Sequence, residues 1–278
     1  NTLYVGQRSN AIDHLMLAHE HGFTIENTGA PVIIADGLLG EHNYIVDVDN
    51  ELCKNAYISG VAKASNVIIS IAHVTGHLAA GVGATFKNVG MGLSARGGKL
   101  AQHSGVIPQI ISKNCTTCKV CQTWCPSDAI TMDNNTAVIN PEKCIGCGEC
   151  LAVCQFSAVK IAWDEDTANL QKKVAEYCLA ILKEKKEKAA FFNFLTHITK
   201  HCDCMDEPFE PDISDIGIVV SRDPVAVEKA TIDLINKHTG KDYFKHIWPE
   251  IDYTVQLNHA HEIGLGNLEY DLENITTD

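Results

Sequence analysis

The sequence predicts an α/β fold, with a mostly parallel sheet and flanking helices, that is interrupted by an inserted, cysteine-rich α+β module. Two observations indicate the host fold: short β-branched runs that end in turn residues, and intervening stretches with an apolar residue every three or four positions. A third indicates the insertion, because eight of the twelve cysteines lie between positions 115 and 154. We therefore expect a discontinuous host domain, residues 1–107 and 164–278, around a module at 108–163.

The composition favours a globular chain and argues against polyanionic partners. Of the 278 residues, 45% are hydrophobic and 21% are charged, as in ordinary globular proteins. The formal net charge of −13 argues against binding to nucleic acid or to anionic membrane surfaces, both of which favour a basic face. No apolar run approaches the ~20 residues of a membrane span. We therefore expect no nucleic-acid partner and no membrane span.

The first 60 residues predict a helix, a strand and a hairpin. Positions 10–21 carry apolar side chains at helical spacing. Positions 31–35 are apolar, rich in β-branched residues and closed by a turn dipeptide, which predicts a strand. Positions 44–48 alternate between apolar and polar residues, and a turn after them could fold the chain back onto 52–58.

Positions 66–72 predict a parallel strand covered on both faces, because apolar residues follow one another almost without a break. The next segment is rich in Gly, Lys, Arg and His, and open α/β sheets place their ligand sites at such strand ends. The candidates are His73, His77 and Lys87 for catalysis and Gly81, Gly83, Lys87, Asn88, Arg96 and Lys99 for binding an anionic cofactor. The alternative is a loop that packs against the cysteine-rich module with its cations on the surface, since no P-loop or dinucleotide fingerprint is present.

The cysteine-rich segment contains two copies of one spacing, Cys115-x2-Cys118-x2-Cys121-x3-Cys125 and Cys144-x2-Cys147-x2-Cys150-x3-Cys154, offset by 29 positions (144 minus 115). Each copy matches the spacing of bacterial 4Fe–4S ferredoxins, in which the fourth cysteine binds the other cluster. The expected ligand sets are therefore Cys115, Cys118, Cys121 with Cys154, and Cys144, Cys147, Cys150 with Cys125. A zinc ribbon needs only four ligands, and disulfide frameworks suit small secreted scaffolds, so both alternatives are disfavoured. Oxygen-labile clusters and unpaired thiols favour the reducing cytoplasm of an anaerobe.

After this module, positions 167–188 predict a long amphipathic helix and positions 189–198 a second buried strand. The strand is followed by His201-Cys202-Asp203-Cys204. Two cysteines separated by one residue could clamp a soft metal, attack a substrate or shuttle a disulfide, so Cys202 and Cys204 are further catalytic candidates. The alternative is a pair of loop cysteines in a reducing compartment.

A third strand is expected at 216–220, and Asp223 after it suits the N-cap of a helix. The carboxyl ends of parallel strands share one edge of a sheet. The polar segments that follow the three strands, 73–77, 201–204 and Asp223, are therefore expected to converge on a second site beside the clusters.

Several of these motifs together resemble one known family. They are His73-x2-Gly76-His77, the segment 81–92 with Lys87-Asn88, Arg96-x2-Lys99, His103, the two cysteine runs, Cys202-Asp203-Cys204 and Asp223-Pro224-Val225-Ala226. This set resembles the domain of unknown function 362 family with its inserted ferredoxin domain, over essentially the whole chain. The resemblance implies an iron–sulfur protein of anaerobic metabolism. The chain departs from the family pattern at Thr75, where a lysine is expected, and at Gln155, where a proline usually follows the last cysteine.

Three functions fit these features. The first is an oxidoreductase whose two 4Fe–4S clusters relay single electrons to an unidentified small-molecule substrate or cofactor in the α/β domain. The second is a ferredoxin-like carrier whose host domain docks a redox partner protein. The third is a metal- or cofactor-handling protein that uses Cys202 and Cys204, and its mark would be an additional metal. We favour the first, because two-cluster ferredoxins function without a host domain.

Overall fold

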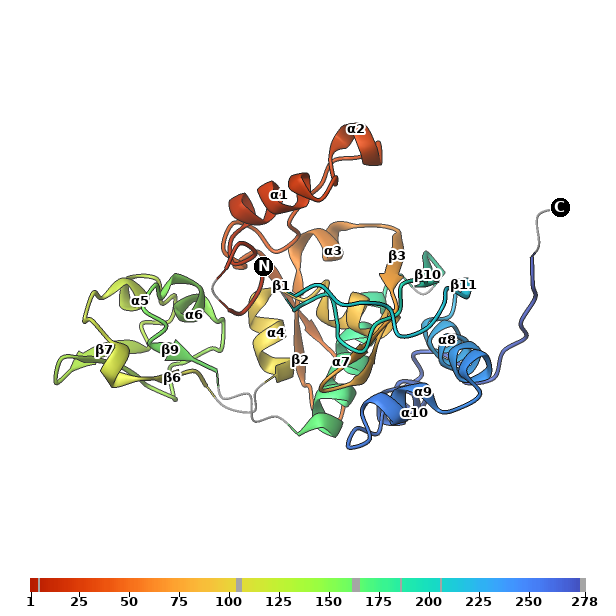
Figure 1. The fold of residues 1–278 in the computed structure, drawn as a ribbon. Coiled ribbons are helices and arrows are strands. Elements are labelled where there is room, and N and C mark those ends of the chain that lie inside the picture. The colour runs from red at the N-terminus through yellow and green to blue at the C-terminus, as the bar shows by residue number, and fades with distance from the viewer. Residues whose placement is uncertain (5, 104–106, 162–165, 186, 206, 276–278) are drawn as a thin grey trace. The chain divides into compact units, whose positions relative to one another are not determined.

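The structure is a computed structural model that describes residues 1–4, 6–103, 107–161, 166–185, 187–205 and 207–275 (Figure 1). The chain divides into two compact units. The first unit comprises Asn1–Val46, Asn55–Ala64 and Leu93–Glu165, and the second comprises Asp47–Lys54, Ser65–Gly92 and Asp166–Asp278. The domain boundary expected at 163/164 lies outside the described residues.

Helices and short strands make up both units. Before the cysteine-rich segment the elements are α1 (Ala11–Glu20), α2 (Ile25–Thr28), β1 (Asn43–Asp47), β2 (Asn55–Ser59), α3 (Gly60–Ala64), β3 (Ile68–His73), β4 (Thr75–His77), β5 (Gly81–Gly83), the π-helical turn η1 (Lys87–Met91) and α4 (Arg96–His103). The cysteine-rich segment contains β6 (Gln109–Ile110), the 3-10 turn η2 (Ser112–Asn114), α5 (Val120–Thr123), β7 (Ile130–Asp133), β8 (Thr136–Ile139), α6 (Glu149–Val153) and β9 (Val159–Lys160). After it come α7 (Thr167–Leu182), β10 (Ala189–Leu195), β11 (Gly217–Ser221), α8 (Pro224–Thr239), α9 (Tyr243–Ile247) and α10 (Thr254–Glu262).

The expected α1 helix and β1–β2 hairpin are confirmed, but the expected strand at 31–35 is wrong. Asn10 caps α1, because its side chain accepts hydrogen bonds from the backbone N–H groups of Ile12 and Asp13. Residues 31–34 have no regular secondary structure. A β-branched run makes a strand only where a neighbouring strand pairs with it, and no ladder reaches this run in the described part of the chain.

The prediction of a mostly parallel sheet is wrong. The largest sheet, in the second unit, has the order β11–β10–β3. β3 runs parallel to β10, whereas β11 runs antiparallel to it. The pairs β4–β5, β6–β9 and β7–β8 are all antiparallel. β4–β5 and β7–β8 are hairpins, and their connections are too short for the crossover that parallel pairing needs.

The prediction that β3 is covered on both faces is also wrong. Its side chains alternate, with Ile68 buried and Ile69 and Ile71 63% and 65% exposed. β10 alternates in the same way, and α8 packs against β10 and β11 in the second unit. The three-stranded sheet therefore has one face in the core and one apolar face that the described residues leave largely open.

Helix α7 confirms the amphipathic pattern of the sequence, although it ends at Leu182. Its apolar face, with Leu170, Val174 and Ile181, is buried and packs against η1 and α10. The contact with η1 is close, because a Cβ added at Gly90 would lie 2.3 Å from the carbonyl oxygen of Val174. Glycine at position 90 is thus required by helix packing.

A buried hydrogen-bond chain joins the sheet to its neighbours. The side chain of Asn193 in β10 accepts a hydrogen bond from Thr85 Oγ1 at 2.7 Å and donates one to Thr231 Oγ1 at 2.9 Å. All three side chains are completely buried. Since water cannot replace a lost partner there, each hydrogen bond is needed to offset the desolvation of these groups.

We expect Asn193→Ala to lower the free energy of unfolding by about 2 kcal/mol, because it leaves two buried hydroxyl groups without their partner. Chemical denaturation of the purified protein measures this change. Asn43→Ala, at an exposed position of β1, serves as the control and should be near neutral. An equal effect of the two substitutions would contradict the proposed importance of the buried chain.

Candidate functional site

The eight cysteines of the two runs line two cavities in the first unit. Cys115, Cys118, Cys121 and Cys154 line one of them. Cys125, Cys144, Cys147 and Cys150 line the other. The fourth cysteine of each run thus lies at the cavity of the other run. This is the crossed arrangement that the spacing predicts for two clusters.

The cysteine loops repeat one backbone conformation at the offset of 29 positions. Thr117 and Lys119 in the first loop adopt left-handed conformations, with φ values of 57° and 62°. The equivalent Gly146 and Gly148 have φ values of 67° and 78°. Left-handed residues on both sides of the second cysteine of each run turn the chain tightly, so that successive thiols can point into one cavity. The sequence spacing therefore encodes a loop geometry as well as a set of ligands.

Backbone N–H groups also point at the sulfur atoms in a duplicated way. The N–H of Ala129 donates to Cys125 Sγ at 3.2 Å, and the N–H of Ala158, 29 positions later, donates to Cys154 Sγ at 3.3 Å. A third bond joins the N–H of Ala137 to Cys115 Sγ at 3.4 Å. Such bonds favour the thiolate form of cysteine, which is the form that binds metals.

The donor set fits a group that carries positive charge. Burial raises the pKa of the Cys150 thiol, and further thiolates around the same cavity raise it more. Four thiolates on one small cavity repel one another, and iron ions supply the charge that makes their ionised form stable. The residues present therefore fit two iron–sulfur clusters.

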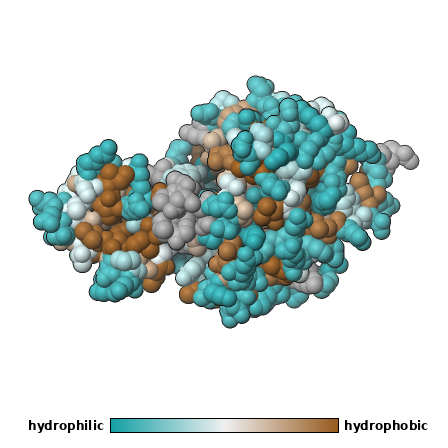
Figure 2. All heavy atoms as spheres, turned by 90° about the horizontal axis from the view of Figure 1, so that it is seen from below, coloured by the Kyte–Doolittle hydropathy of each residue, from teal (hydrophilic) through white to brown (hydrophobic). Residues whose placement is uncertain are grey.

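Apolar side chains surround this module. Val120, Ile145 and Phe156 are 39%, 54% and 46% exposed. Val120 and Phe156 line the first cavity, and Ile145 lines the second. Figure 2 shows apolar residues gathered on the visible face of this module. Exposed apolar surface beside a redox centre is a feature of sites where partner proteins dock.

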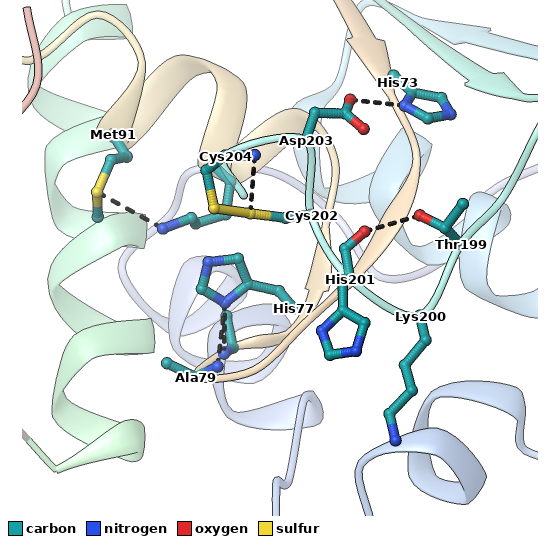
Figure 3. The surroundings of a disulfide bond; sticks show 12 residues. His73, His77, Ala79, Met91, Thr199, Lys200, His201, Cys202, Asp203 and Cys204 are labelled. Atoms are coloured by element: carbon teal, nitrogen blue, oxygen red, sulfur yellow. Dashed lines mark hydrogen bonds and ion pairs between the residues drawn. A yellow bond between two sulfur atoms is a disulfide. The ribbon is translucent and has the colours of Figure 1, made fainter. Parts of the chain in front are cut away.

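The second unit brings together three of the catalytic candidates. One ring nitrogen of His77 and the Sγ atoms of Cys202 and Cys204 lie within 4.8 Å of one another. The two cysteines are joined by a disulfide bond. His77 is buried, Cys202 is half-buried and Cys204 is exposed. Figure 3 shows the imidazole between the backbone of Ala79 and the disulfide.

Gly76 allows this approach. The N–H of Gly76 donates to the carbonyl oxygen of Thr199 at 2.8 Å, and a Cβ at position 76 would lie 2.2 Å from the carbonyl oxygen of Lys200. Only glycine lets β4 come this close to the chain that leads into Cys202. Gly76 belongs to a sequence motif, but the motif alone does not reveal this role.

His73 positions the cysteine loop rather than contacting the sulfur atoms. Its Nδ1 lies 2.7 Å from a carboxylate oxygen of Asp203, the residue between the two cysteines. Its Nε2 faces the carbonyl oxygens of Thr196 and His197 at 2.9 and 3.2 Å. All these partners are acceptors, so both ring nitrogens donate when the ring is protonated. The hydrogen bond to Asp203 raises the pKa of His73, although burial opposes the shift.

Aromatic contacts hold the same loop from its other side. The ring of His201 stacks on Phe209 at 4.8 Å between centroids and meets the edge of Trp248 at 5.3 Å. Trp248 Nε1 donates to the carbonyl oxygen of Lys200 at 3.0 Å, and the Lys200 ammonium lies over the indole ring. Sequence patterns did not signal the support from Trp248, because this residue is distant in the chain from the cysteines.

The expected convergence of three strand ends holds for two of them. β3 and β10 are parallel, so the segments after them meet, as the His73–Asp203 contact shows. β11 is antiparallel to β10, so Asp223 follows it at the opposite end of the sheet. There Asp223 caps α8 by accepting from the N–H groups of Val225 and Ala226, and it also accepts from Asn267. Placing Asp223 at the second site was wrong.

The binding candidates are distributed over both units. Gly81 lies in β5 opposite His77, where a Cβ would lie 2.7 Å from Tyr253 Cβ, and Gly83 pairs with Thr75. Lys87 contacts Met91 Sδ at 3.5 Å, and Asn88 donates to Ser70 Oγ and to the carbonyl oxygen of Ile71.

Arg96 and Lys99 lie in the first unit, in α4. The Arg96 side chain is completely buried and donates to the carbonyl oxygens of Thr2 and Ser9. Lys99 donates to the carbonyl oxygen of Ser94, and desolvation lowers its pKa to about 8. The structure thus shows packing contacts for these candidates within each unit.

Comparisons with known proteins find one protein family and several short matches to ferredoxin-related proteins. The model of the family described as "Domain of unknown function (DUF362)" matches residues 2–233. Over 55 residues, 20% of this chain, the protein is 34% identical to a component of the ion-translocating oxidoreductase complex of Methanosarcina acetivorans. It is 40% identical over 53 residues, 18% of the chain, to Ferredoxin-1 of Caulobacter vibrioides, and 38% identical over 52 residues, 16% of the chain, to a ferredoxin-like protein in nif region of Sinorhizobium fredii.

The matched segment also covers only part of each relative's own length. The chain spans 21% of the Methanosarcina protein and 47% of the Caulobacter ferredoxin, but 81% of the Sinorhizobium protein. No solved structure matches the chain significantly. Within the described residues, no helix is both long and apolar enough to cross a membrane.

The contact between His73 and Asp203 predicts a pH dependence. Because the pKa of His73 is raised in the folded state, its stabilising effect is complete below the ordinary value of 6.5 and is lost as the pH rises through the folded-state pKa. Asp203→Asn should move the pKa of His73 down towards 6.5, as followed by NMR titration of the ring. Asp252→Asn, at the start of α10, is the control and should leave the titration of His73 unchanged. An unaltered pKa in Asp203→Asn would show that the carboxylate does not hold the ring.

Proposed function

Since this chain belongs to the domain of unknown function 362 family and carries a ferredoxin-like segment, we propose that it is an iron–sulfur electron-transfer protein. It would bind two 4Fe–4S clusters, one by Cys115, Cys118, Cys121 and Cys154 and the other by Cys144, Cys147, Cys150 and Cys125. The 108–163 segment would be a module inserted in a host domain made of 1–107 and 164–278. Oxygen-labile clusters would suit the reducing cytoplasm of an anaerobe.

The observation that carries this proposal is the crossed lining of the two cavities. Each cavity takes three cysteines from one run and the fourth from the other. A zinc ribbon or a set of unrelated thiols gives no reason for this exchange, whereas the spacing of two-cluster ferredoxins requires it. When bound, each cluster would supply one-electron transfer, and its potential would depend on hydrogen bonds to sulfur and on solvent exposure.

The finer proposal is a reductase whose substrate site lies at His77, Cys202 and Cys204. Its support is the buried histidine held against two cysteines in a unit that an electron carrier alone does not need. A carrier whose host domain docks a redox partner is the alternative, and the exposed apolar side chains around the cysteine cavities favour such a partner. A protein that handles a metal with the same three residues is the second alternative, because three donor atoms lie within 4.8 Å.

We expect Cys118→Ser to lower the iron content of anaerobically purified protein from about eight to about four atoms per chain, because one cluster loses a ligand. Elemental analysis and the visible spectrum measure this loss. Cys53→Ser is the matched control, because Cys53 is a buried cysteine of the second unit that lines neither cavity. Full iron content in Cys118→Ser would contradict the ligand assignment.

Cys202→Ser should leave the iron content and the cluster spectrum unchanged, because Cys202 lines neither cysteine cavity. The same substitution should abolish turnover or partner chemistry, because it removes one of the three residues of the proposed substrate site. Cluster potentials measured by electron paramagnetic resonance during a redox titration check that both centres persist. Bleaching of either cluster in this variant would show that Cys202 is a cluster ligand and would overturn the assignment of two separate sites.

A further inference from the structure

We infer that Cys202 and Cys204 form a redox-active disulfide centre that exchanges with thiol and disulfide substrates, and that the neutral ring of His77 stabilises its thiolate. The inference names the substrate class of the proposed reductase and rests on the proposed function only for the source of electrons. It follows from the loop between the cysteines, the hydrogen bonds of His77 and the different exposure of the two sulfur atoms.

A structural role does not account for this disulfide. A disulfide stabilises a fold chiefly by closing a loop in the unfolded chain, and its effect grows with the length of that loop. Cys202 and Cys204 are only two positions apart. The loop is moreover already held without the disulfide, by the contact of Asp203 with His73 and by Trp248 on Lys200. The bond therefore adds little to stability, whereas half-buried and exposed sulfur atoms remain open to exchange.

The hydrogen bonds of His77 fix its tautomer. The backbone N–H groups of Ala79 and Ala80 both donate to His77 Nδ1, each at 3.1 Å. Nδ1 must therefore present its lone pair, and the proton of the neutral ring lies on Nε2. A second proton on Nδ1 would face two N–H groups, so the ring is held in its neutral form. His77 thus offers an N–H donor at Nε2 without taking up a charge.

The direction of the hydrogen bonds at His77 favours a thiol centre over a metal site. A histidine that ligates a metal with one ring nitrogen almost always donates the N–H of the other to a carbonyl or carboxylate. In His77 the other nitrogen instead accepts two hydrogen bonds. Ligation through Nε2 would require moving the ring proton to Nδ1, against both amides. A neutral ring with its proton on Nε2, and with one nitrogen within 4.8 Å of both sulfur atoms, is suited to hydrogen-bonding a thiolate.

The two cysteines differ in a way that assigns their roles. Cys204 is exposed, so its Sγ is the one that a substrate thiolate can reach. Cys202 is half-buried, and its Sγ accepts a hydrogen bond from the N–H of Cys204 at 3.3 Å. An N–H donor at sulfur stabilises the thiolate over the thiol. Cys202 is therefore the better leaving group and Cys204 the point of attack.

A substrate dithiol, or two substrate thiols, is the reductant of the Cys202–Cys204 disulfide in this exchange. A substrate thiolate bonds to Cys204 Sγ, the Cys202–Cys204 bond breaks, and its electron pair goes to Cys202 as a thiolate beside His77 Nε2–H. A second substrate thiolate then attacks the substrate sulfur, which releases Cys204 as a thiolate and the substrate as a disulfide. Two electrons pass from substrate to protein, and solvent supplies protons to the two cysteines according to their pKa. The reverse sequence reduces a substrate disulfide.

The first test equilibrates the intact holoprotein in buffers of reduced and oxidised dithiothreitol, followed by alkylation and peptide mass spectrometry. We expect a two-electron transition on the peptide that contains Cys202 and Cys204. A peptide that stays entirely oxidised or entirely reduced across the range would overturn the inference. A stoichiometric metal held by the reduced wild type and lost in Cys204→Ser would overturn it in favour of a metal site. Iron content of the same samples reports on the clusters, so failure of the proposed function is seen separately.

The second test measures the role of His77 through the pH dependence of Cys202 alkylation by iodoacetamide in Cys204→Ser protein. Loss of a hydrogen bond to a charged group should raise the thiolate pKa by about one unit in His77→Phe. His77→Gln, whose amide can still donate, should recover part of the shift, and His246→Phe, at an exposed position of α9, should change nothing. An unshifted profile in His77→Phe would show that His77 does not act on the thiolate.

A third test distinguishes the two cysteines. Reduced Cys202→Ser should form a lasting mixed disulfide with an aromatic disulfide probe, because the exposed Cys204 thiolate attacks the probe and no second thiol resolves the new bond. Cys204→Ser should react several-fold more slowly, since Cys202 is half-buried. Faster labelling of Cys202 would reverse the assigned roles and contradict the inference as stated.

Discussion

The parallel pairing of β3 with β10 is the constraint on which the second site depends. In this register His73 lies beside Phe194, so the chain leaves both strands at the same edge of the sheet. The segment after β3 carries His77 and the segment after β10 carries the two cysteines. The His73–Asp203 contact and the close approach of Gly76 to Lys200 then fix these segments against each other. An antiparallel pairing would place them at opposite ends.

The cysteine module could be predicted from the sequence because its chemistry is local. Successive cysteines of each run are three or four positions apart, and the offset of 29 positions reproduces cysteines, left-handed residues and N–H donors together. The direction of strands is not local. Nothing in residues 217–221 distinguishes a parallel from an antiparallel partner for β10, so Asp223 was placed at the wrong end of the sheet. The strand expected at 31–35 was wrong for the same reason, because a strand forms only where a neighbouring strand pairs with it.

The glycine-rich segment shows how one composition can serve several purposes. The sequence suggested an anion site, yet individual glycines meet different demands: Gly76 at Lys200, Gly81 at Tyr253 and Gly90 at Val174. Gly76 and Gly90 each let two backbones approach within a distance that a Cβ would prevent, and Gly81 leaves room for Tyr253 Cβ. Such approaches join segments far apart in the chain, which sequence patterns cannot show. The tautomer of His77 could not be predicted from the sequence either. It is set by hydrogen bonds from the backbone N–H groups of Ala79 and Ala80 rather than by a side chain.

The two cysteine loops share a conformation but differ in the residues that adopt it. The first uses Thr117 and Lys119 at left-handed positions, where a side chain costs about 1 kcal/mol or more, whereas the second uses glycine. Gly148 meets an additional demand, because a Cβ there would lie 3.1 Å from Cγ of the buried Arg96. Gly97 in the same helix lies against the backbone of Gly146 and Cys147. The second loop therefore packs on α4 through Gly97 and Gly148, whereas a Cβ at Gly146 would meet no neighbouring atom. The contact with α4 accounts for glycine at position 148, and the left-handed backbone alone favours it at position 146.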